Sequence, residues 1–445
     1  MRRIIPLAVL ILVIGFLFGL LSKYFAGASA GASTISAINT GDTAWVLIST
    51  ALVMLMTPAV GFFYGGMVQK KNVVSILKQS FVILAIVSLQ WVLFGYSLVF
   101  GKDIMGIIGG FTFFGLRDVG FSPNPVYAAT IPHLAFMMFQ AMFAIVTPAL
   151  IIGAVAGRIS FKSLIIFTLL WTTFIYDPIA HWVWGIGGWL HTLGALDFAG
   201  GTVVHISAGF AGIVAAMMVG KRSEKTNGDQ YAHNVPFVLL GAALLWFGWF
   251  GFNAGSALSA SGLAWNAFVT TNTAAAAAGL VWMILSWKEH RRPSAMATAT
   301  GAVCGLVAIT PASGFVGPIA SIAIGVIAGV VTYLALVFRT KKIPVDDTLD
   351  VWAAHGIGGV TGALLTGIFA EKVINSAGNN GLLFGNPYQL VIQIIAVVST
   401  ASFAFVGTWI LLKAMSIFMK LRVSKAEELA GLDKSSHGEE GYVLS

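Results

Sequence analysis

The sequence predicts an all-α membrane protein that crosses the bilayer many times. Only 9% of its 445 residues are charged and 58% are hydrophobic, whereas a soluble domain carries about 25% charged residues. The long apolar runs lack the alternation of barrel strands, and a helix satisfies its own backbone hydrogen bonds in lipid. The number of runs and the charges between them predict eleven transmembrane helices, arranged as an inverted 5+5 repeat plus one extra helix.

The composition also limits the classes of function. The net charge of +8 does not indicate a nucleic-acid partner, because the basic residues lie in short runs between apolar segments. The single cysteine, Cys304, excludes an internal disulfide and a cysteine metal cluster. The sequence has no phosphate-binding loop, zinc-helix motif or serine-elbow motif. We therefore expect a protein that is not an enzyme and that uses no cofactor or metal.

Three regions are expected along the chain. Residues 1–30 are typical of a signal peptide, because two arginines precede an apolar run and Ala28-Ser29-Ala30 follows it. The alternative is an uncleaved first helix, since the run of about 18 residues is long enough to span a bilayer. Residues 31–420 are the predicted transmembrane domain, and residues 421–445 form a predicted cytoplasmic tail.

The charges between the apolar runs predict the topology. The eleven spans are expected at residues 43–66, 77–100, 131–155, 163–181, 202–220, 235–255, 264–286, 295–312, 318–338, 350–370 and 388–418. Basic residues are concentrated at 69–71, 158–162, 221–225, 288–292, 339–342 and after 420. Basic loops stay in the cytoplasm. The mature N-terminus is therefore predicted outside the cell membrane, and the C-terminus inside.

This topology predicts an inverted repeat. The first five spans begin outside and the next five begin inside, so the two halves face in opposite directions. Aromatic residues followed by glycines occur at 62–66 in the first span and at 249–255 in the sixth. Sites in such repeats lie near the bilayer midplane, at the interface of the halves. Span 11 falls outside the repeat.

Two histidines occupy corresponding spans of the two halves. His205 lies in span 5 and His355 in span 10. Gly201 and Gly209 flank His205 at intervals of four, and Gly359 follows His355 by four, so each histidine shares a helix face with small residues. Small residues let helices approach closely, and an ionisable residue within a membrane indicates a functional site. We expect both histidines to meet in one site.

Several motifs resemble the ammonium transporter (Amt/Rh) family, with the closest likeness to bacterial and archaeal Amt members. They are Phe63-Tyr64-Gly65-Gly66 and the segments at 180–185, 194–201, 248–255 and 350–359, and the resemblance covers residues 42–441. It implies an eleven-helix inverted repeat, a homotrimer with one pore per subunit, and conduction of ammonium or ammonia and of methylammonium. The competing hypothesis is an ammonium sensor that signals through its tail.

The resemblance also assigns roles to single residues. His205 and His355 are similar to the twin pore histidines, and Phe143 and Phe252 to the phenylalanine gate. The external ammonium recruitment site is matched by Phe143, Trp184 and Ser256, with Asp197 as its acidic support. Aromatic faces attract a desolvated cation by about 2 kcal/mol or more. The alternatives are core packing for the phenylalanines, an interfacial position for Trp184 and a helix N-cap for Asp197.

The remaining acidic residues and the tail have simpler interpretations. Asp346, Asp347 and Asp350 precede span 10 and are expected to cap it. Asp177 departs from the family pattern, and a cap or a polar contact at the outer end of span 4 is expected. The tail is either a solvated end or, as the resemblance implies, a segment that packs against neighbouring subunits and takes part in regulation by a PII-type signalling protein.

Overall fold

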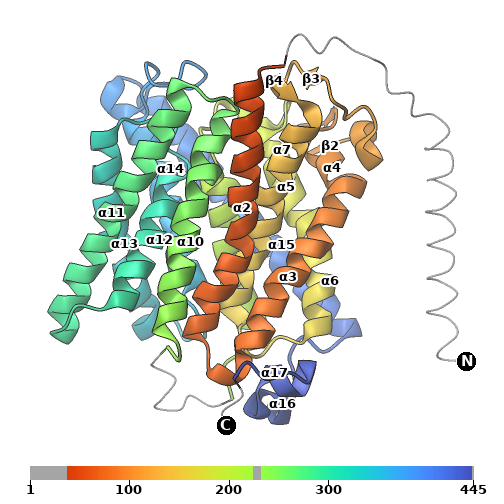
Figure 1. The fold of residues 1–445 in the computed structure, drawn as a ribbon, viewed down its shortest axis with the longest axis vertical. Coiled ribbons are helices and arrows are strands. Elements are labelled where there is room, and N and C mark those ends of the chain that lie inside the picture. Colours follow the sequence, from red (N-terminus) through yellow and green to blue (C-terminus); the bar gives the residue numbers. More distant parts are fainter. Residues whose placement is uncertain (1–37, 224–231, 443–445) are drawn as a thin grey trace, which may run out of the picture.

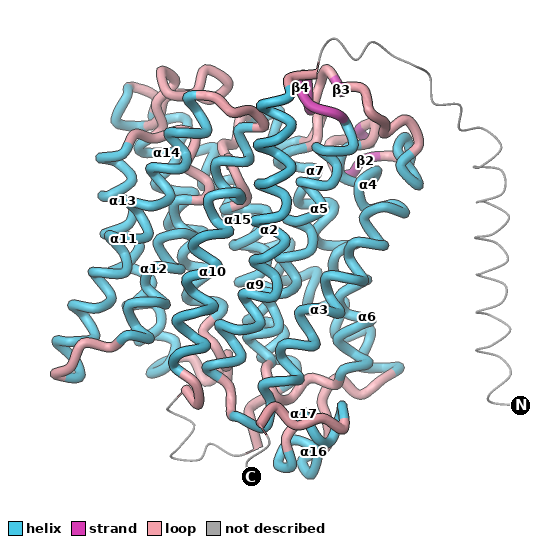
Figure 2. The backbone as a smooth tube through the Cα atoms, viewed as in Figure 1, coloured by secondary structure: helices cyan, strands magenta, loops and turns pink. Residues whose placement is uncertain are grey.

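The computed structural model of the protein describes residues 38–223 and 232–442. The predicted signal peptide at 1–30 lies outside the described residues. The long helices run side by side in one bundle (Figure 1), and most loops gather at its two ends (Figure 2). The described strands form two small antiparallel pairs, β1 with β2 and β3 with β4. The predicted all-α architecture is confirmed.

The helices and strands have the following bounds. The α-helices are α2 Thr40–Met67, α3 Val73–Gln90, α4 Tyr96–Phe100, α5 His133–Ile151, α6 Phe161–Trp171, α7 Asp177–Trp184, α8 Trp189–Leu193, α9 Ser207–Val219, α10 Val235–Ala254, α11 Gly262–His290, α12 Ala295–Ile309, α13 Pro318–Lys342, α14 Gly358–Phe369, α15 Pro387–Phe418, α16 Lys425–Ala430 and α17 Leu432–His437. The π-helical segments are η3 Trp91–Gly95, η6 Thr172–Tyr176, η7 Gly201–Ile206 and η9 Trp352–Ile357. The 3-10 segments are η2 Lys70–Asn72, η4 Phe111–Leu116, η5 Ile152–Val155, η8 Gly255–Ala257 and η10 Leu382–Phe384. The strands are β1 Asp103–Ile104, β2 Ile108–Gly109, β3 Pro123–Asn124 and β4 Ala128–Pro132.

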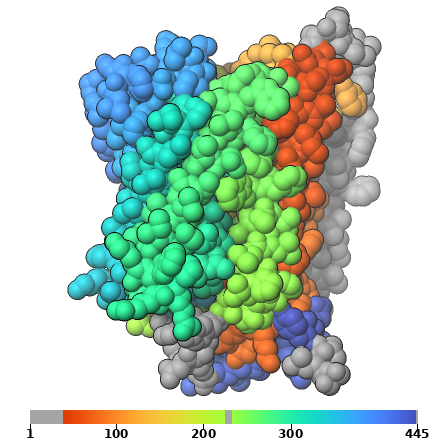
Figure 3. Space-filling view, turned by 60° about the vertical axis from the view of Figure 1, so that its left-hand side comes forward, coloured from red at the N-terminus to blue at the C-terminus, as the bar shows by residue number. Residues whose placement is uncertain are grey.

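Nine helical segments of the described chain are long and apolar enough to cross a membrane. The other two predicted spans correspond to α12, which has 15 residues, and to the combined segment of η9 and α14. Both are shorter than the nine candidate spans, so the count of eleven stays a prediction. α10 and α11 lie on the surface of the bundle (Figure 3), and their apolar residues Phe247, Trp265 and Leu280 are more than half exposed. Such a surface suits contact with lipid.

The first span of each predicted half packs against its counterpart. α2 and α10 are in extensive contact, and the contact needs glycines on both helices. A Cβ at Gly241 of α10 would lie 2.3 Å from the backbone nitrogen of Phe63, and one at Gly66 of α2 would lie 2.5 Å from the carbonyl oxygen of Asn234. This pairing of corresponding helices supports the predicted repeat.

The three aspartates before span 10 have different partners, and only Asp347 caps it. Its two oxygens accept the backbone N–H groups of Val351 and Trp352 at 3.1 and 2.8 Å. Asp350 instead forms an ion pair with Arg339. The expectation that all three cap span 10 is therefore wrong for two of them, because buried arginines nearby compete for their carboxylates.

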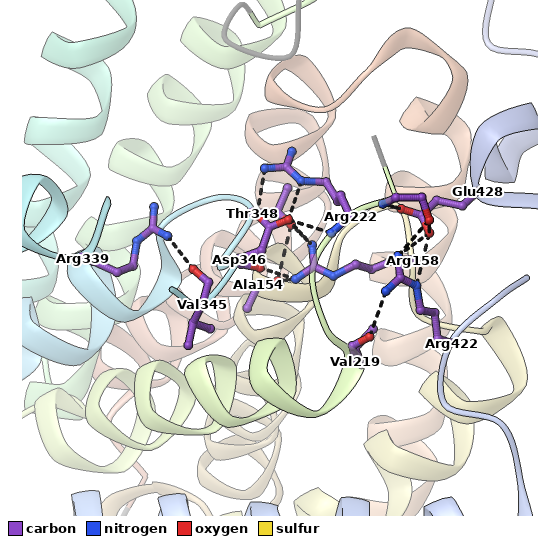
Figure 4. A network of polar contacts seen from close by, with 11 residues as sticks. Ala154, Arg158, Val219, Arg222, Arg339, Val345, Asp346, Thr348, Arg422 and Glu428 are labelled. Carbon is purple, nitrogen blue, oxygen red and sulfur yellow. Dashed lines mark hydrogen bonds and ion pairs between the residues drawn. The ribbon is translucent and has the colours of Figure 1, made fainter. Parts of the chain in front are cut away.

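Asp346 is the centre of a charged network between loops at the tail end of the bundle (Figure 4). Arg222 donates to it from Nη2 at 2.8 Å and from Nε at 3.0 Å, and Arg158 Nη1 lies 3.8 Å away. Burial alone raises the pKa of Asp346, but the hydrogen bonds and the charge of Arg222 outweigh burial and lower the pKa to about 2. The network joins the loops after α9 and α13 to the end of η5.

The described part of the tail is folded onto the bundle. Asp433 of α17 accepts the backbone N–H groups of Val74 and Ser75 at 3.1 and 2.7 Å, so the tail caps the first turn of α3. Glu428 of α16 accepts from Arg422 and from Ser223, which follows α9. Because these contacts bury Asp433 and Glu428, the described tail is not a solvated end.

Candidate pore site

His205 and His355, which the sequence predicts to meet, are in contact inside the bundle. Their Nδ1 atoms lie 3.3 Å apart, and the rings stack with centroids 5.4 Å apart and an interplanar angle of 20°. The residues are 1% and 4% exposed. One Nδ1 atom can donate its hydrogen to the other when both rings are neutral. The geometric expectation is therefore met, while the role of the pair in transport stays a prediction.

Glycines bring the two histidine-bearing segments together. A Cβ at Gly209 would lie 2.1 Å from the backbone nitrogen of Gly356, and one at Gly359 would lie 3.1 Å from Cβ of His205. Both histidines lie in π-helical segments, η7 and η9. Such segments are rare and are frequent at functional sites. The predicted glycine faces thus set the close approach of the two helices.

Each histidine segment begins at a buried aspartate. Asp197 accepts the N–H groups of Gly200, Gly201 and Thr202 at 2.8, 2.6 and 2.8 Å, that of Val203 at 3.2 Å, and the Thr202 hydroxyl. These five donors satisfy the carboxylate and the free N–H groups of the first helical turn. The cap expected for Asp197 is therefore present, and its carboxylate has no position free for direct contact with an ion.

Aromatic rings stack above the histidines. Phe143 of α5 and Phe252 of α10 have ring centroids 4.4 Å apart, and Phe252 lies 5.9 Å from the His205 ring. Trp184 meets Phe143 edge-on at 5.7 Å. Phe143 and Phe252 are 1% and 0% exposed. The structure thus brings the predicted gate residues and Trp184 into one column over the histidine pair.

Trp184 and Ser256 are held beside this column by different hydrogen bonds. The indole nitrogen of Trp184 donates to the carbonyl oxygen of Asp197 at 3.0 Å, which fixes the ring against the start of η7. Ser256, in η8, donates its hydroxyl to the carbonyl oxygen of Phe252 at 2.9 Å. The hydroxyl oxygen keeps its lone pairs for a ligand. Asp197 therefore both holds the Trp184 ring through its carbonyl oxygen and caps the first turn of η7.

An apolar cavity adjoins the histidines. It is lined by Met56, Val60, Phe63, Tyr64, Val146, Leu150, His205, Leu245, Trp249, Phe252, Val303 and His355. Nε2 of His205 is buried and has no partner among the described residues. A small permeant with hydrogen-bonding capacity can satisfy this atom, whereas a hydrated ion would lose its water shell against apolar walls.

Trp249 is a site residue that sequence reasoning did not single out. Its ring stacks on His205 with centroids 5.4 Å apart and an angle of 24°, and its indole nitrogen donates to Thr310 at 2.9 Å. The available signal is its position three residues before Phe252, which places both on one face of α10. The ion-pair network around Asp346 also went unpredicted, because its partners come from loops far apart in the sequence.

Comparisons with known proteins identify the family. Residues 44–442 match the model of the Ammonium Transporter Family. The chain is 52% identical over 403 residues to "Ammonium transporter Amt1" of Archaeoglobus fulgidus, which covers 91% of this chain and 99% of that protein. The crystal structure of Saccharomyces cerevisiae Mep2 matches with a TM-score of 0.83 and 36% identity, over 90% of this chain and 94% of that one.

A further solved structure, titled "Sensor Amt Protein", matches with a TM-score of 0.81 and 35% identity, over 89% of this chain and 98% of that one. These similarities extend over nearly the whole described bundle, including both histidine segments and the tail. They agree with the multi-pass membrane architecture and with the expectation that the chain is not an enzyme. The chain belongs to the ammonium transporter family.

Proposed function

We propose that this protein conducts ammonium or ammonia, and methylammonium, through the apolar cavity beside His205 and His355. The single observation that carries the proposal is the Nδ1 contact of 3.3 Å between these histidines, directly below the aromatic column. Paired imidazoles offer both a donor and an acceptor within an apolar passage. They pass a small polar molecule along without the fixed charge of a carboxylate, which would hold a cation in place.

The outer end of the aromatic column is the proposed recruitment site. There an ammonium ion would lie over the rings of Phe143 and Trp184, and Ser256 would accept one of its hydrogen bonds. Cation–π attraction supplies about 2 kcal/mol or more when the ion is desolvated. Phe143 and Phe252 then act as a gate that excludes hydrated ions, because their rings leave no room for a water shell. Ammonium therefore loses its water shell before it reaches His205.

We also propose an oligomeric assembly for the protein and an orientation in the membrane. The chain lies in the cell membrane as a homotrimer with one pore per subunit, its mature N-terminus outside and its C-terminus in the cytoplasm. Support comes from the basic residues Arg158, Arg222 and Arg422, which gather at the end of the bundle that holds the tail. A PII-type signalling protein is the proposed regulatory partner at this face.

An ammonium sensor is the second candidate function. It is favoured by the similarity to the structure titled "Sensor Amt Protein" and by the docked tail, which connects α16 and α17 to the loops beneath the pore. Transport by the isolated protein separates the two candidates, since a sensor without a conducting pore gives no flux.

The test uses purified protein in liposomes, with protein-free liposomes as the control. An ammonium step is applied while current and internal pH are recorded, and uptake of labelled methylammonium is measured in parallel. We expect excess ammonium to suppress methylammonium uptake and excess sodium to leave it unchanged, because the aromatic site selects ions that dehydrate readily. Methylammonium uptake that is insensitive to ammonium, or no flux above the control, contradicts the proposal.

A further inference from the structure

A second buried polar pair lies between two helices, away from the histidines. Asp177, the first residue of α7, accepts a hydrogen bond of 2.7 Å from Nε2 of Gln90, the last residue of α3. Asp177 is 0% exposed and Gln90 is 2% exposed. Both lie inside helical segments that are long and apolar enough to cross the membrane, 70–100 and 161–193. An ionisable group at such a position is costly unless its charge is compensated.

The described contacts around this pair leave acceptor oxygens without a hydrogen-bond donor. Oδ1 of Asp177 and Oε1 of Gln90 are both buried acceptors without a partner. Two neighbouring donors are engaged elsewhere. The Thr173 hydroxyl donates to the carbonyl oxygen of Leu169 at 2.8 Å. The indole nitrogen of Trp91 donates at 3.1 Å to a backbone carbonyl of α5. No arginine or lysine is paired with Asp177 among the described ion pairs.

The backbone is built around this contact. Gln90 is followed by the π-helical segment η3, and Asp177 is preceded by the π-helical segment η6. A Cβ at Gly95, the last residue of η3, would lie 2.5 Å from Oε1 of Gln90, so a glycine there makes room for the amide. The other two π-helical segments of the described chain carry the histidines. Such segments are frequent at functional sites.

Asp197 shows how this chain accommodates a buried carboxylate that keeps its charge. Its oxygens receive five hydrogen bonds, four from backbone N–H groups and one from Thr202. Asp177 receives a single one, from Gln90. A carboxylic acid needs fewer donors than a carboxylate and supplies one of its own. A proton on Asp177 therefore adds the donor that the pair lacks.

We propose that Asp177 and Gln90 form an intramembrane proton-binding site, in which Asp177 is held as the neutral acid and the acid–amide pair joins α3 to α7. The carboxylate takes the proton from a hydronium ion of the solvent, which is left as water. The amide donates to Oδ2, and the acid hydroxyl donates to the amide oxygen, so both unpaired acceptors are used. The ligand is a single proton, and the site is separate from the histidine pair.

Among the described residues, no other titratable group on the packed elements forms an ion pair or a hydrogen bond with Asp177. His181, one turn further along α7, has both ring nitrogens engaged, with the carbonyl oxygen of Val99 at 2.6 Å and with Asp103 at 2.9 Å. His133 of α5 and Tyr96 of α4 bond to each other at 2.5 Å. Tyr176 is uncharged, and its buried hydroxyl forms no hydrogen bond within the described part of the chain, with Asp177 or any other residue. Of the residues that the structure describes, the amide of Gln90 is therefore the one group that donates to the Asp177 carboxyl group.

Infrared spectroscopy of the full-length protein in lipid tests the proposal directly. Spectra are taken with and without 13C-labelled aspartate at about pH 9, where an ordinary carboxyl group of pKa near 3.9 is ionised. We expect a C=O stretching band of a protonated aspartic acid in the wild-type protein. The band should disappear in Asp177→Asn and persist in Asp197→Asn, the matched control whose carboxylate is fully hydrogen-bonded. Absence of the band in the wild type, or its persistence in Asp177→Asn, overturns the proposal.

Two further variants keep the test informative if Asp177→Asn does not fold. In Gln90→Leu the acid remains, but its C=O group loses the amide donor, so the band should move to higher frequency; an unmoved band overturns the pairing. Unfolding midpoints in detergent give an independent readout. Asp177→Asn should unfold at the wild-type midpoint, because its amide N–H replaces the acid hydroxyl, whereas Asp177→Leu should unfold earlier. If Asp177→Asn and Asp177→Leu lower the unfolding midpoint equally, the acid hydroxyl does not donate to the amide oxygen of Gln90.

Discussion

Asp197 and Asp347 occupy equivalent positions in the two halves of the chain, because each caps a π-helical segment and precedes a histidine by eight residues. Asp347 lies next to the charged network beneath the bundle, and Asp197 lies next to Trp184 at the opposite end. The two segments therefore enter the bundle from opposite ends and meet at His205 and His355. Each cap fixes the start of a segment and thereby the depth of its histidine.

The first prediction concerns this cap. Asp347→Ala leaves the N–H groups of Val351 and Trp352 without an acceptor, which costs about 1 to 2 kcal/mol of stability. Because η9 then loses its fixed start, His355 moves relative to His205 and methylammonium uptake should fall. Asp42→Ala is the control, since Asp42 accepts only the N–H of Ala260 at 2.9 Å, outside both histidine segments. Equal loss of uptake in both variants would assign Asp347 a general structural role.

The second prediction concerns the aromatic gate. Phe252→Ala removes the ring that lies 4.4 Å from Phe143 and leaves a cavity, at a cost of about 3 to 5 kcal/mol. Water can enter this space, so we expect a sodium leak current in liposomes that the wild type lacks. Phe250→Ala is the matched control on the same helix, because Phe250 stacks on Phe268 at 3.9 Å instead. A leak in the control alone, or in neither variant, contradicts the gate.

The third prediction concerns acid stability. Asp346 has a pKa of about 2 in the folded protein, below the value of about 3.9 expected for an unfolded chain. A lowered folded-state pKa stabilises the protein above the unfolded value, and this stability is lost as the pH falls from about 4 towards 2. The side chain is 3% exposed, and the difference corresponds to about 2 to 3 kcal/mol.

Asp346→Asn cannot titrate, so its unfolding midpoint should depend less on pH between about 4 and 2 than that of the wild type. The measurement is thermal unfolding in detergent across this pH range. Glu440→Gln is the control, because Glu440 lies at the exposed surface, where it pairs with Lys434 at 3.4 Å. Parallel pH curves for Asp346→Asn and the wild type would show that the ion pairs with Arg158 and Arg222 add no stability.

The fourth prediction concerns the tail. Deleting residues 421–445 removes Asp433 from the first turn of α3 and Glu428 from Ser223. Because buried hydrogen bonds to charged groups each contribute about 1.5 to 3 kcal/mol, the truncated protein should unfold earlier, and transport or PII binding should change. Glu439→Gln disturbs only an ion pair with Lys78 at 3.6 Å on the surface and serves as the control. If transport, PII binding and the unfolding midpoint are all unchanged in the truncated protein, the tail has no regulatory role.

Much of the fold and of the central site could be predicted from the sequence. Apolar runs of membrane-spanning length predict helices because lipid permits few other structures, and glycine spacing predicted the close approach at His205. The cap by Asp197 follows from its position before a helix. The partners of Asp346 could not be predicted, since three carboxylates in a short loop offer identical local signals. The arginine partners of Asp346 lie in loops that are far apart in the sequence and meet only in the folded bundle.

The last prediction concerns the histidine pair. His205→Ala or His355→Ala leaves the other Nδ1 atom without its partner at 3.3 Å and widens the apolar passage. Each single substitution should therefore strongly reduce ammonium transport or change its selectivity, while the protein still inserts and assembles. The losses should not add, because residues that act as one unit show interaction energies of about 0.5 to 3 kcal/mol in a double-mutant cycle.

The measurement is transport by both single variants and the double variant in the same liposomes, at matched protein density. Once either imidazole is gone, the remaining one cannot exchange its shared hydrogen, so the second substitution has little left to remove. The double variant should therefore transport nearly as well as the worse single variant. Trp249→Phe provides a reference, because it keeps an aromatic ring beside His205 but loses the indole N–H that bonds to Thr310. Strictly additive losses, or full activity with unchanged selectivity in both single variants, would mean that the histidines act as packing residues.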